Sequence, residues 1–324
     1  MRQHSTTLLF LLCLLTLQAT AFGRGPRVVI FDTDWWTDVD DVVALRLLLR
    51  AEREGRVQVL GTCIDAVNRW SAVSLDRFCR AEGRDSMPLG LDFQATDYNG
   101  RPPYQEMLSK AGPAGRITRN ADCPDCVVFY RRLLSRAEGR VDIICVGYPN
   151  ALARLLESEA DSLSPLGGRE LVRRKVRRLW MMGGQYPAGR ENNFRRTARS
   201  IAAARRVVSE WPSPITFLGY EVGHRVVVGG LLAGTPGAGQ DLLYLSLLAH
   251  KSPQGRYAWD PMLTWMACLG SEKRAGYRCV TGTNVVDDEG ANVFTPQRGG
   301  KHRYVIMRQE PEWYQAQLDT LLLP

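Results

Sequence analysis

The chain has 324 residues, of which 45% are hydrophobic and 23% are charged, and its formal net charge is +8. This length suits one large α/β domain or two ordinary ones, and the composition excludes a disordered or fibrous protein. The basic cluster GRELVRRKVRRLW has no recognisable nucleic-acid module beside it, so we expect a solvated helix-to-strand face and no nucleic-acid partner.

The N-terminus, MRQHSTTLLFLLCLLTLQATAFG, combines a basic start, an apolar run from Leu8 to Leu17 and a small-residue site at 19–21. This layout is typical of a cleaved secretory signal, and the apolar run is too short to span a bilayer comfortably. We therefore expect a signal peptide over residues 1–21 and a secreted, extracellular protein without stable membrane insertion. An uncleaved anchor is the alternative.

Short apolar runs alternate with helical patterns through the rest of the chain. Strands are expected at 27–31, 57–64, 141–147, 176–184 and 215–220. Helices are expected from about residue 40 and within 69–83, 127–139, 150–160, 198–211 and 240–250. This alternation predicts an α/β fold, a single large domain over 22–324 with a mostly parallel twisted sheet flanked by helices. The loop-rich segment 91–125 is expected to form a lid or an insertion.

The cysteines give a second set of expectations. Seven remain once Cys13 leaves with the signal, and an odd number in an oxidising compartment leaves at least one unpaired. Cys63 and Cys145 lie in apolar strand-like runs and are expected in the core. Cys123 and Cys126 form a CPDC motif without two further zinc ligands at a suitable spacing, so a local disulfide or two surface thiols are expected.

The first strand leads into a dense group of carboxylates. Five aspartates lie within ten residues: Asp32, Asp34, Asp38, Asp40 and Asp41. In a parallel sheet this strand end is where ligands bind. Carboxylates at this density repel one another unless a cation lies among them, and hard oxygen ligands suit Ca²⁺ or Mg²⁺. Helix capping accounts for one or two of the five, so the sequence predicts a metal site.

The segment DTDWWTDVDDVVAL resembles the N-terminal signature of the inosine-uridine preferring nucleoside hydrolases. The usual form is DxDPGxDD, whereas this chain carries Trp35, Trp36 and two extra residues before the paired aspartates. Four later segments resemble the family in matching order: LGTCIDAVN, ICVGYPNALARLL, LWMMGGQYPAGRENNF and GRYAWDPMLTWMA. The resemblance covers most of the chain after the signal and indicates a divergent, secreted member of these calcium-dependent ribohydrolases.

This resemblance implies the residues of an active site. Ca²⁺ would be held by the carboxylates of Asp34, Asp41 and Asp260 and by the backbone carbonyl of Pro149. Asp34 would also be the general base for a water that the calcium activates. The groups expected to bind the ribose hydroxyls are Asp40, Asn68, Glu191, Asn193 and Asp260. Asp38 has no obvious counterpart in the family pattern, and Asp32 is expected to brace the loop.

The implied reaction is hydrolysis of the N-glycosidic bond of a ribonucleoside, or of a related ribosyl compound, through an oxocarbenium-like transition state. The partner is then a small-molecule nucleoside or ribosyl substrate. The family is often oligomeric, so a homo-oligomer is a further expectation, although nothing in the sequence identifies an interface.

The half of the site that would meet the base departs from the family. Well-known members have a histidine beside the last metal aspartate, and Trp259 replaces it here with a side chain that has no titratable proton. His224 is therefore the candidate catalytic acid, with His250 a poorer one. The aromatic residues that would stack on a base, or else pack in the core, are Trp35, Trp36, Tyr186 and Trp259.

There are two alternatives to this assignment. One is a hydrolase-like protein that binds a ribosyl or sugar ligand without turnover. The other is a Mg²⁺-dependent phosphohydrolase, which also uses a DxD motif after a strand. It is disfavoured because no lysine is well placed after a strand to bind phosphate.

Overall fold

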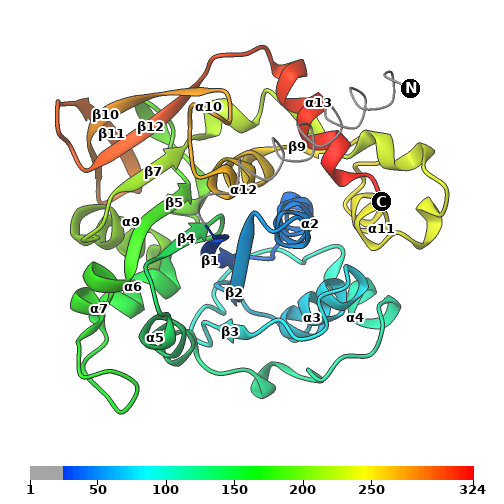
Figure 1. The fold of residues 1–324 in the computed structure, drawn as a ribbon, viewed down its shortest axis with the longest axis horizontal. Helices are drawn as coiled ribbons and strands as arrows, with labels where there is room; N and C mark the ends of the chain where they lie inside the picture. The colour runs from blue at the N-terminus through cyan, green and yellow to red at the C-terminus, as the bar shows by residue number, and fades with distance from the viewer. Residues whose placement is uncertain (1–24) are drawn as a thin grey trace, which may run out of the picture.

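The computed structural model describes residues 25–324, so the predicted signal peptide lies outside the described residues. A ten-stranded sheet runs through the molecule in the order β3-β2-β1-β4-β5-β7-β12-β10-β11-β6 (Figure 1). Neighbours from β3 to β12 pair in parallel, and the last three pairings are antiparallel. The strands are β1 (Arg27–Thr33), β2 (Val57–Ile64), β3 (Leu89–Leu91), β4 (Val141–Cys145), β5 (Val176–Met182), β6 (Ala188–Arg190), β7 (Ile215–Leu218), β10 (Tyr277–Val286), β11 (Ala291–Pro296) and β12 (His302–Met307), with β8 (Val227–Val228) and β9 (Arg256–Tyr257) forming a separate pair.

Helices cover both faces of the parallel part of the sheet. They are α2 (Asp40–Arg53), α3 (Ser71–Ala81), α4 (Gln105–Ala111), α5 (Cys126–Arg136), α6 (Asn150–Glu157), α7 (Gly168–Lys175), α8 (Asn192–Arg195), α9 (Ala198–Glu210), α10 (Tyr220–Gly223), α11 (Leu242–Ala249), α12 (Trp259–Leu269) and α13 (Pro311–Leu322), with short 3₁₀ turns at Asn120–Asp122, Gly230–Gly234 and Ala238–Gln240. The helices α5, α6, α7 and α9 lie on one side of the sheet, and α2 and α12 lie on the other (Figure 1).

The first strand shows why this arrangement forms. Side chains alternate between the faces of a strand, so Val29 and Phe31 enter the core beneath α2 and α12, while Ile30 enters the core beneath α5 and α6. A strand that is buried on both faces needs a continuous apolar run, as VVIF supplies. Asp40 and Asp41 then begin α2, where free N–H groups favour negative charge.

The predicted α/β class and mostly parallel sheet are confirmed. The strand predicted at 57–64 has those bounds, and α2 begins at Asp40 as expected. The segment 91–125 contains the helix α4, and the antiparallel β10–β12 region was not anticipated. In the basic cluster, the exposed Arg173 and Arg174 pair with Glu170 on α7.

The prediction for the CPDC motif was wrong. Within residues 25–324 all seven cysteines are free, and Cys123 and Cys126 are both buried, so they form neither a disulfide nor a pair of surface thiols. Cys63 and Cys145 are core residues, as expected. Among residues 25–324 there is also no helix with the length and apolar character needed to cross a bilayer.

Candidate active site

The site lies at the carboxyl ends of three neighbouring parallel strands. β1 pairs with β4, and β4 pairs with β5, so the loops that follow them meet at one edge of the sheet. A cavity of about 440 Å³ opens there, within the range of small-molecule sites. Its lining comes from the β1–α2 loop, the ends of β4 and β5, the β6–α8 segment, α10 and the β9–α12 segment.

Four of the predicted carboxylates line this cavity together: Asp34, Asp40, Asp41 and Asp260. The oxygens of Asp40, Asp41 and Asp260 approach within 4.8 Å of one another. Asp40 and Asp41 open α2, while Asp260 opens α12, and these two helices pack side by side. The backbone N–H of Asp260 donates to Asp40 Oδ2 at 3.3 Å, which joins two helix starts that are 220 residues apart.

We call the four carboxylates Asp34, Asp40, Asp41 and Asp260 the floor of the cavity. The protein itself supplies little positive charge to this floor. Asp41 accepts hydrogen bonds from the Thr33 hydroxyl and the Trp35 N–H, and Asp34 accepts one from the Trp36 N–H at 2.9 Å. Burial raises the pKa of Asp34 to about 7. Burial, followed by repulsion from neighbouring carboxylates, also raises the pKa values of Asp40 and Asp260 well above their ordinary range. These crowded oxygens fit a hard divalent cation such as Ca²⁺ or Mg²⁺.

A glycine at the end of β4 allows this crowding. A β-carbon on Gly147 would collide with the backbone nitrogen of Asp34 and with Oδ2 of Asp65. The neighbouring Tyr148 N–H donates to Asp65 Oδ1 at 3.0 Å. The loop after β4 can therefore lie directly against the DTD segment only because residue 147 has no side chain.

Glu191 and Asn193 form a polar wall of the cavity. Glu191 caps α8 by accepting the N–H of Asn193 at 2.8 Å and the N–H of Gly184 at 3.0 Å. Burial raises the pKa of Glu191 to about 7. The Asn193 amide nitrogen donates to the carbonyls of Val146 and Met182, at the ends of β4 and β5. These bonds fix both side chains to the sheet edge.

A second wall is aromatic and contains Tyr220, Tyr257 and Trp259. Trp259 stacks on Tyr220 with ring centres 5.6 Å apart, and its indole N–H donates to the Tyr220 carbonyl at 2.9 Å. The ring of Tyr257 lies 5.3 Å from that of Trp259. This wall suits a flat heterocycle.

Asp38, whose role the sequence left open, holds an arginine beside the aromatic wall. Its two oxygens accept hydrogen bonds from Nε and Nη2 of Arg256 at 2.9 and 2.6 Å. Although burial opposes it, this guanidinium keeps the pKa of Asp38 below its ordinary value. Arg256 in turn lies 5.4 Å from the ring centre of Trp259. Asp38 thus joins the β1–α2 loop to the segment that carries Asp260.

Three predicted site residues do not line the cavity. The side chain of Asn68 accepts the Trp70 N–H before α3, and the Pro149 carbonyl accepts the Ala153 N–H within α6. His224 stacks on the far side of Tyr220, with its Nδ1 3.1 Å from the Tyr220 carbonyl oxygen. Val146 and Tyr148, from the same turn as Pro149, do reach the cavity.

The aromatic residues divide between the cavity and the core. Trp35 is fully buried against Phe78 and Tyr104, and its indole N–H donates to Ser74. Trp36 packs near Tyr98, and Tyr186 stacks on Tyr304 inside the core. Only Trp259 of the four candidates lines the cavity among the residues that the structure describes.

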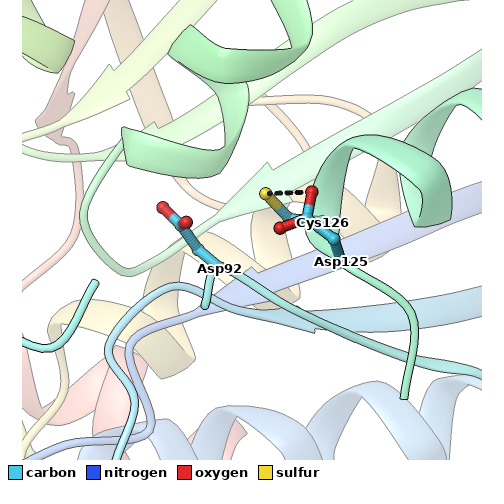
Figure 2. Close-up of side chains that lie close together, drawn as sticks. All are labelled: Asp92, Asp125 and Cys126. Atoms are coloured by element: carbon cyan, nitrogen blue, oxygen red, sulfur yellow. Dashed lines mark hydrogen bonds between the residues drawn. The ribbon is translucent and has the colours of Figure 1, made fainter. Parts of the chain in front are cut away.

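A second acidic cluster lies elsewhere, where β3 and α5 meet (Figure 2). Asp92, Asp125 and Cys126 bring their ligand atoms together, and the thiol of Cys126 contacts Asp125. Arg154 from α6 already supplies the cation: its Nη1 lies 2.6 Å from Asp92, 2.8 Å from Asp125 and 3.0 Å from the Cys126 sulfur. This cluster is an ion-paired brace between β3, α5 and α6.

No protein-family model matches the chain, and no curated protein sequence matches it. Solved structures do. The inosine-uridine preferring nucleoside hydrolase of Bacillus anthracis matches with a TM-score of 0.66 and 17% identity, over 91% of this chain and 99% of that chain. The plant nucleoside hydrolase PpNRh1 matches with a TM-score of 0.67 and 17% identity, over 92% and 99%. The type III effector protein XopQ, in complex with adenosine diphosphate ribose, matches with a TM-score of 0.64 and 16% identity, over 92% and 94%. The resemblance seen in the sequence is thereby confirmed at the level of the fold, and the chain has the fold of the nucleoside hydrolases.

Proposed function

We propose that the protein hydrolyses the N-glycosidic bond of ribonucleosides, or of a related ribosyl compound, to ribose and base with Ca²⁺ as its cofactor. One observation carries this proposal. A single cavity joins a floor of four carboxylates to a polar wall of Glu191 and Asn193 and to an aromatic wall around Trp259. These are the groups needed to activate water, hold a ribose and accept a flat base.

The carboxylate floor would hold the cation through Asp34, Asp41 and Asp260. A divalent cation bound there would lower the pKa of an adjacent water. Asp34 would accept a proton from the water that attacks C1′. Asp40, Glu191 and Asn193 hold the ribose hydroxyls, and their contacts strengthen as positive charge develops on the ring.

The base side has no histidine among the lining residues that the structure describes, and its candidate proton donors are the phenols of Tyr220 and Tyr257. The only N–H of the Trp259 side chain is already donated to Tyr220, and no histidine lines the cavity. A phenol is a weaker acid than the imidazolium of a histidine, so the departing base would receive less acid assistance than a histidine gives. The charge of Arg256, on the same side of the cavity, is balanced by Asp38.

Replacing Asp38 with asparagine is expected to lower kcat/KM about tenfold, because Arg256 loses its charged partner and its fixed position beside Trp259. The measurement is steady-state ribose release. Arg256→Gln should give a similar loss, and the double variant should be no worse than either single one. Additive losses in the double variant would show that the two residues act independently.

A second function, binding of a ribosyl ligand without turnover, is favoured by the same absence of a histidine from the cavity lining that the structure describes. XopQ, which shares the fold, is described in complex with adenosine diphosphate ribose, and this supports a ribosyl ligand for the cavity in either case. The two functions differ only in whether the bound glycosidic bond is broken.

The experiment that separates them is reducing-sugar release from a panel of purine and pyrimidine nucleosides, with Ca²⁺ and after metal removal. Metal-dependent ribose release is the result expected of the hydrolase. Ligand binding by calorimetry without any release would instead establish the binding protein. Neither release nor binding across the panel would contradict both.

A further inference from the structure

The mouth of the cavity carries positive charge on the side of the ribose wall. Arg190 and Arg196 flank Glu191 and Asn193 in the sequence, and both arginines line the same cavity. The third lining arginine, Arg256, lies by the aromatic wall and is neutralised by Asp38. The free positive charge therefore lies on the chain segment that carries the residues that would hold the ribose.

Arg196 is held in place but has no charged partner. Its Nη2 donates to the Asn99 carbonyl at 2.9 Å, and the Trp36 indole N–H donates to the same carbonyl at 3.1 Å. No carboxylate lies within ion-pair distance of Arg196 among residues 25–324. The loop at residue 99 thus fixes this guanidinium against the segment that carries the aspartates.

Arg190 is only weakly neutralised. Its partner, Glu289, and Arg190 itself are both exposed, and exposed ion pairs contribute little because water screens them. An incoming anion can therefore compete for this guanidinium. Two guanidinium groups facing one mouth suit a phosphate, which offers several acceptor oxygens.

The ribose geometry indicates where that phosphate would be attached. C1′ must face the carboxylate floor, where the water attacks, and the 2′ and 3′ hydroxyls lie on the ring beside it. The 5′ carbon is the exocyclic arm and is free to extend toward the mouth. We propose that the substrate carries a phosphate on its 5′ carbon, bound by Arg196 and Arg190, so that the protein prefers a nucleoside 5′-phosphate to the free nucleoside.

This inference rests on the proposed function, and it changes only the substrate. The water oxygen forms a bond to C1′, and the C1′–N bond breaks with its electron pair remaining on the base. One proton of the water passes to Asp34, and the base takes up a proton from solvent. The products are ribose 5-phosphate and the free base, and the phosphate ester is untouched.

The test compares kcat/KM for inosine and uridine with that for their 5′-monophosphates, with Ca²⁺ present. The wild-type protein should prefer the monophosphates at least tenfold, and Arg196→Gln should remove about tenfold of that preference. Arg195→Gln is the matched control, because Arg195 is an exposed neighbour that does not line the cavity and has no ion pair in the described part of the chain. It should retain the wild-type preference.

Arg190→Gln provides a second variant, with the same direction expected, if Arg196→Gln does not fold. A wild-type preference for the free nucleosides would overturn the inference, as would equal losses of preference in the Arg195 and Arg196 variants. Calorimetric binding of the monophosphates to Asp34→Asn separates the two proposals. If the monophosphates bind to Asp34→Asn, lose this binding when Arg196 is also replaced, and are not hydrolysed by the wild type, the phosphate site would stand and hydrolysis would be contradicted.

Discussion

Replacing Asp34 with asparagine is expected to reduce the rate of ribose release by about a thousandfold or more, because a carboxamide cannot accept the proton of the attacking water. The fold should survive the change. Asparagine has nearly the same size, and its side-chain oxygen can still accept the Trp36 N–H that Asp34 accepts at 2.9 Å. Burial already raises the pKa of Asp34 to about 7, so an uncharged side chain costs less to bury there when no cation is bound.

The measurement is kcat at saturating Ca²⁺, together with the thermal unfolding midpoint of each protein. Asp97→Asn is a suitable control, because Asp97 is an acidic residue outside the cavity lining that pairs with Arg199. That variant should turn over substrate at the wild-type rate. Wild-type rates in Asp34→Asn would remove Asp34 from the role of general base.

The residue pattern alone, without the family resemblance, indicated only the part of the cavity lining that is encoded locally. Asp34, Asp40 and Asp41 lie between the end of β1 and the first turn of α2. This short strand-to-helix connection places them together. Asp260 is distant in sequence and could be assigned only through the family resemblance. Glu191 and Asn193 were found in the same way, and their hydrogen bonds hold both side chains at the start of α8.

What the sequence could not predict depends on contacts between distant segments. The Asp38–Arg256 pair joins residues 218 apart, and no local pattern encodes it. Trp35 has a φ of 49°, a left-handed conformation that is rare for a bulky residue, and its side chain is buried against Phe78. The sequence left open whether the two tryptophans stack on a base or pack in the core, and the structure buries both of them.

Removal of divalent cations is expected to lower the thermal stability of the protein, and by more at pH 8 than at pH 5.5. Burial raises the pKa values of Asp40, Asp41 and Asp260 in the metal-free protein, so its folded state retains protons that the unfolded chain has already lost. A raised folded pKa means that stability falls as the pH rises above the unfolded values, near 4, toward the folded ones. A bound cation stabilises the ionised carboxylates and reverses this loss. Its contribution is RT ln(1 + [L]/Kd), about 2.7 kcal/mol at a hundredfold excess over Kd and about 4.1 kcal/mol at a thousandfold excess.

The comparison is best made by adding CaCl₂ to metal-free protein at each pH, with NaCl at equal ionic strength as the control, because chelators bind calcium less tightly in acid. Asp260→Asn should lose most of the calcium-dependent rise in the unfolding midpoint. An undiminished rise in that variant would place the cation elsewhere, and the cluster around Asp92 and Asp125 would be the next site to test. That second result is not expected, because the guanidinium of Arg154 already contacts both carboxylates there and would repel a divalent ion. The floor of the cavity has no such resident charge, and a cation bound there would remove the repulsion among its aspartates.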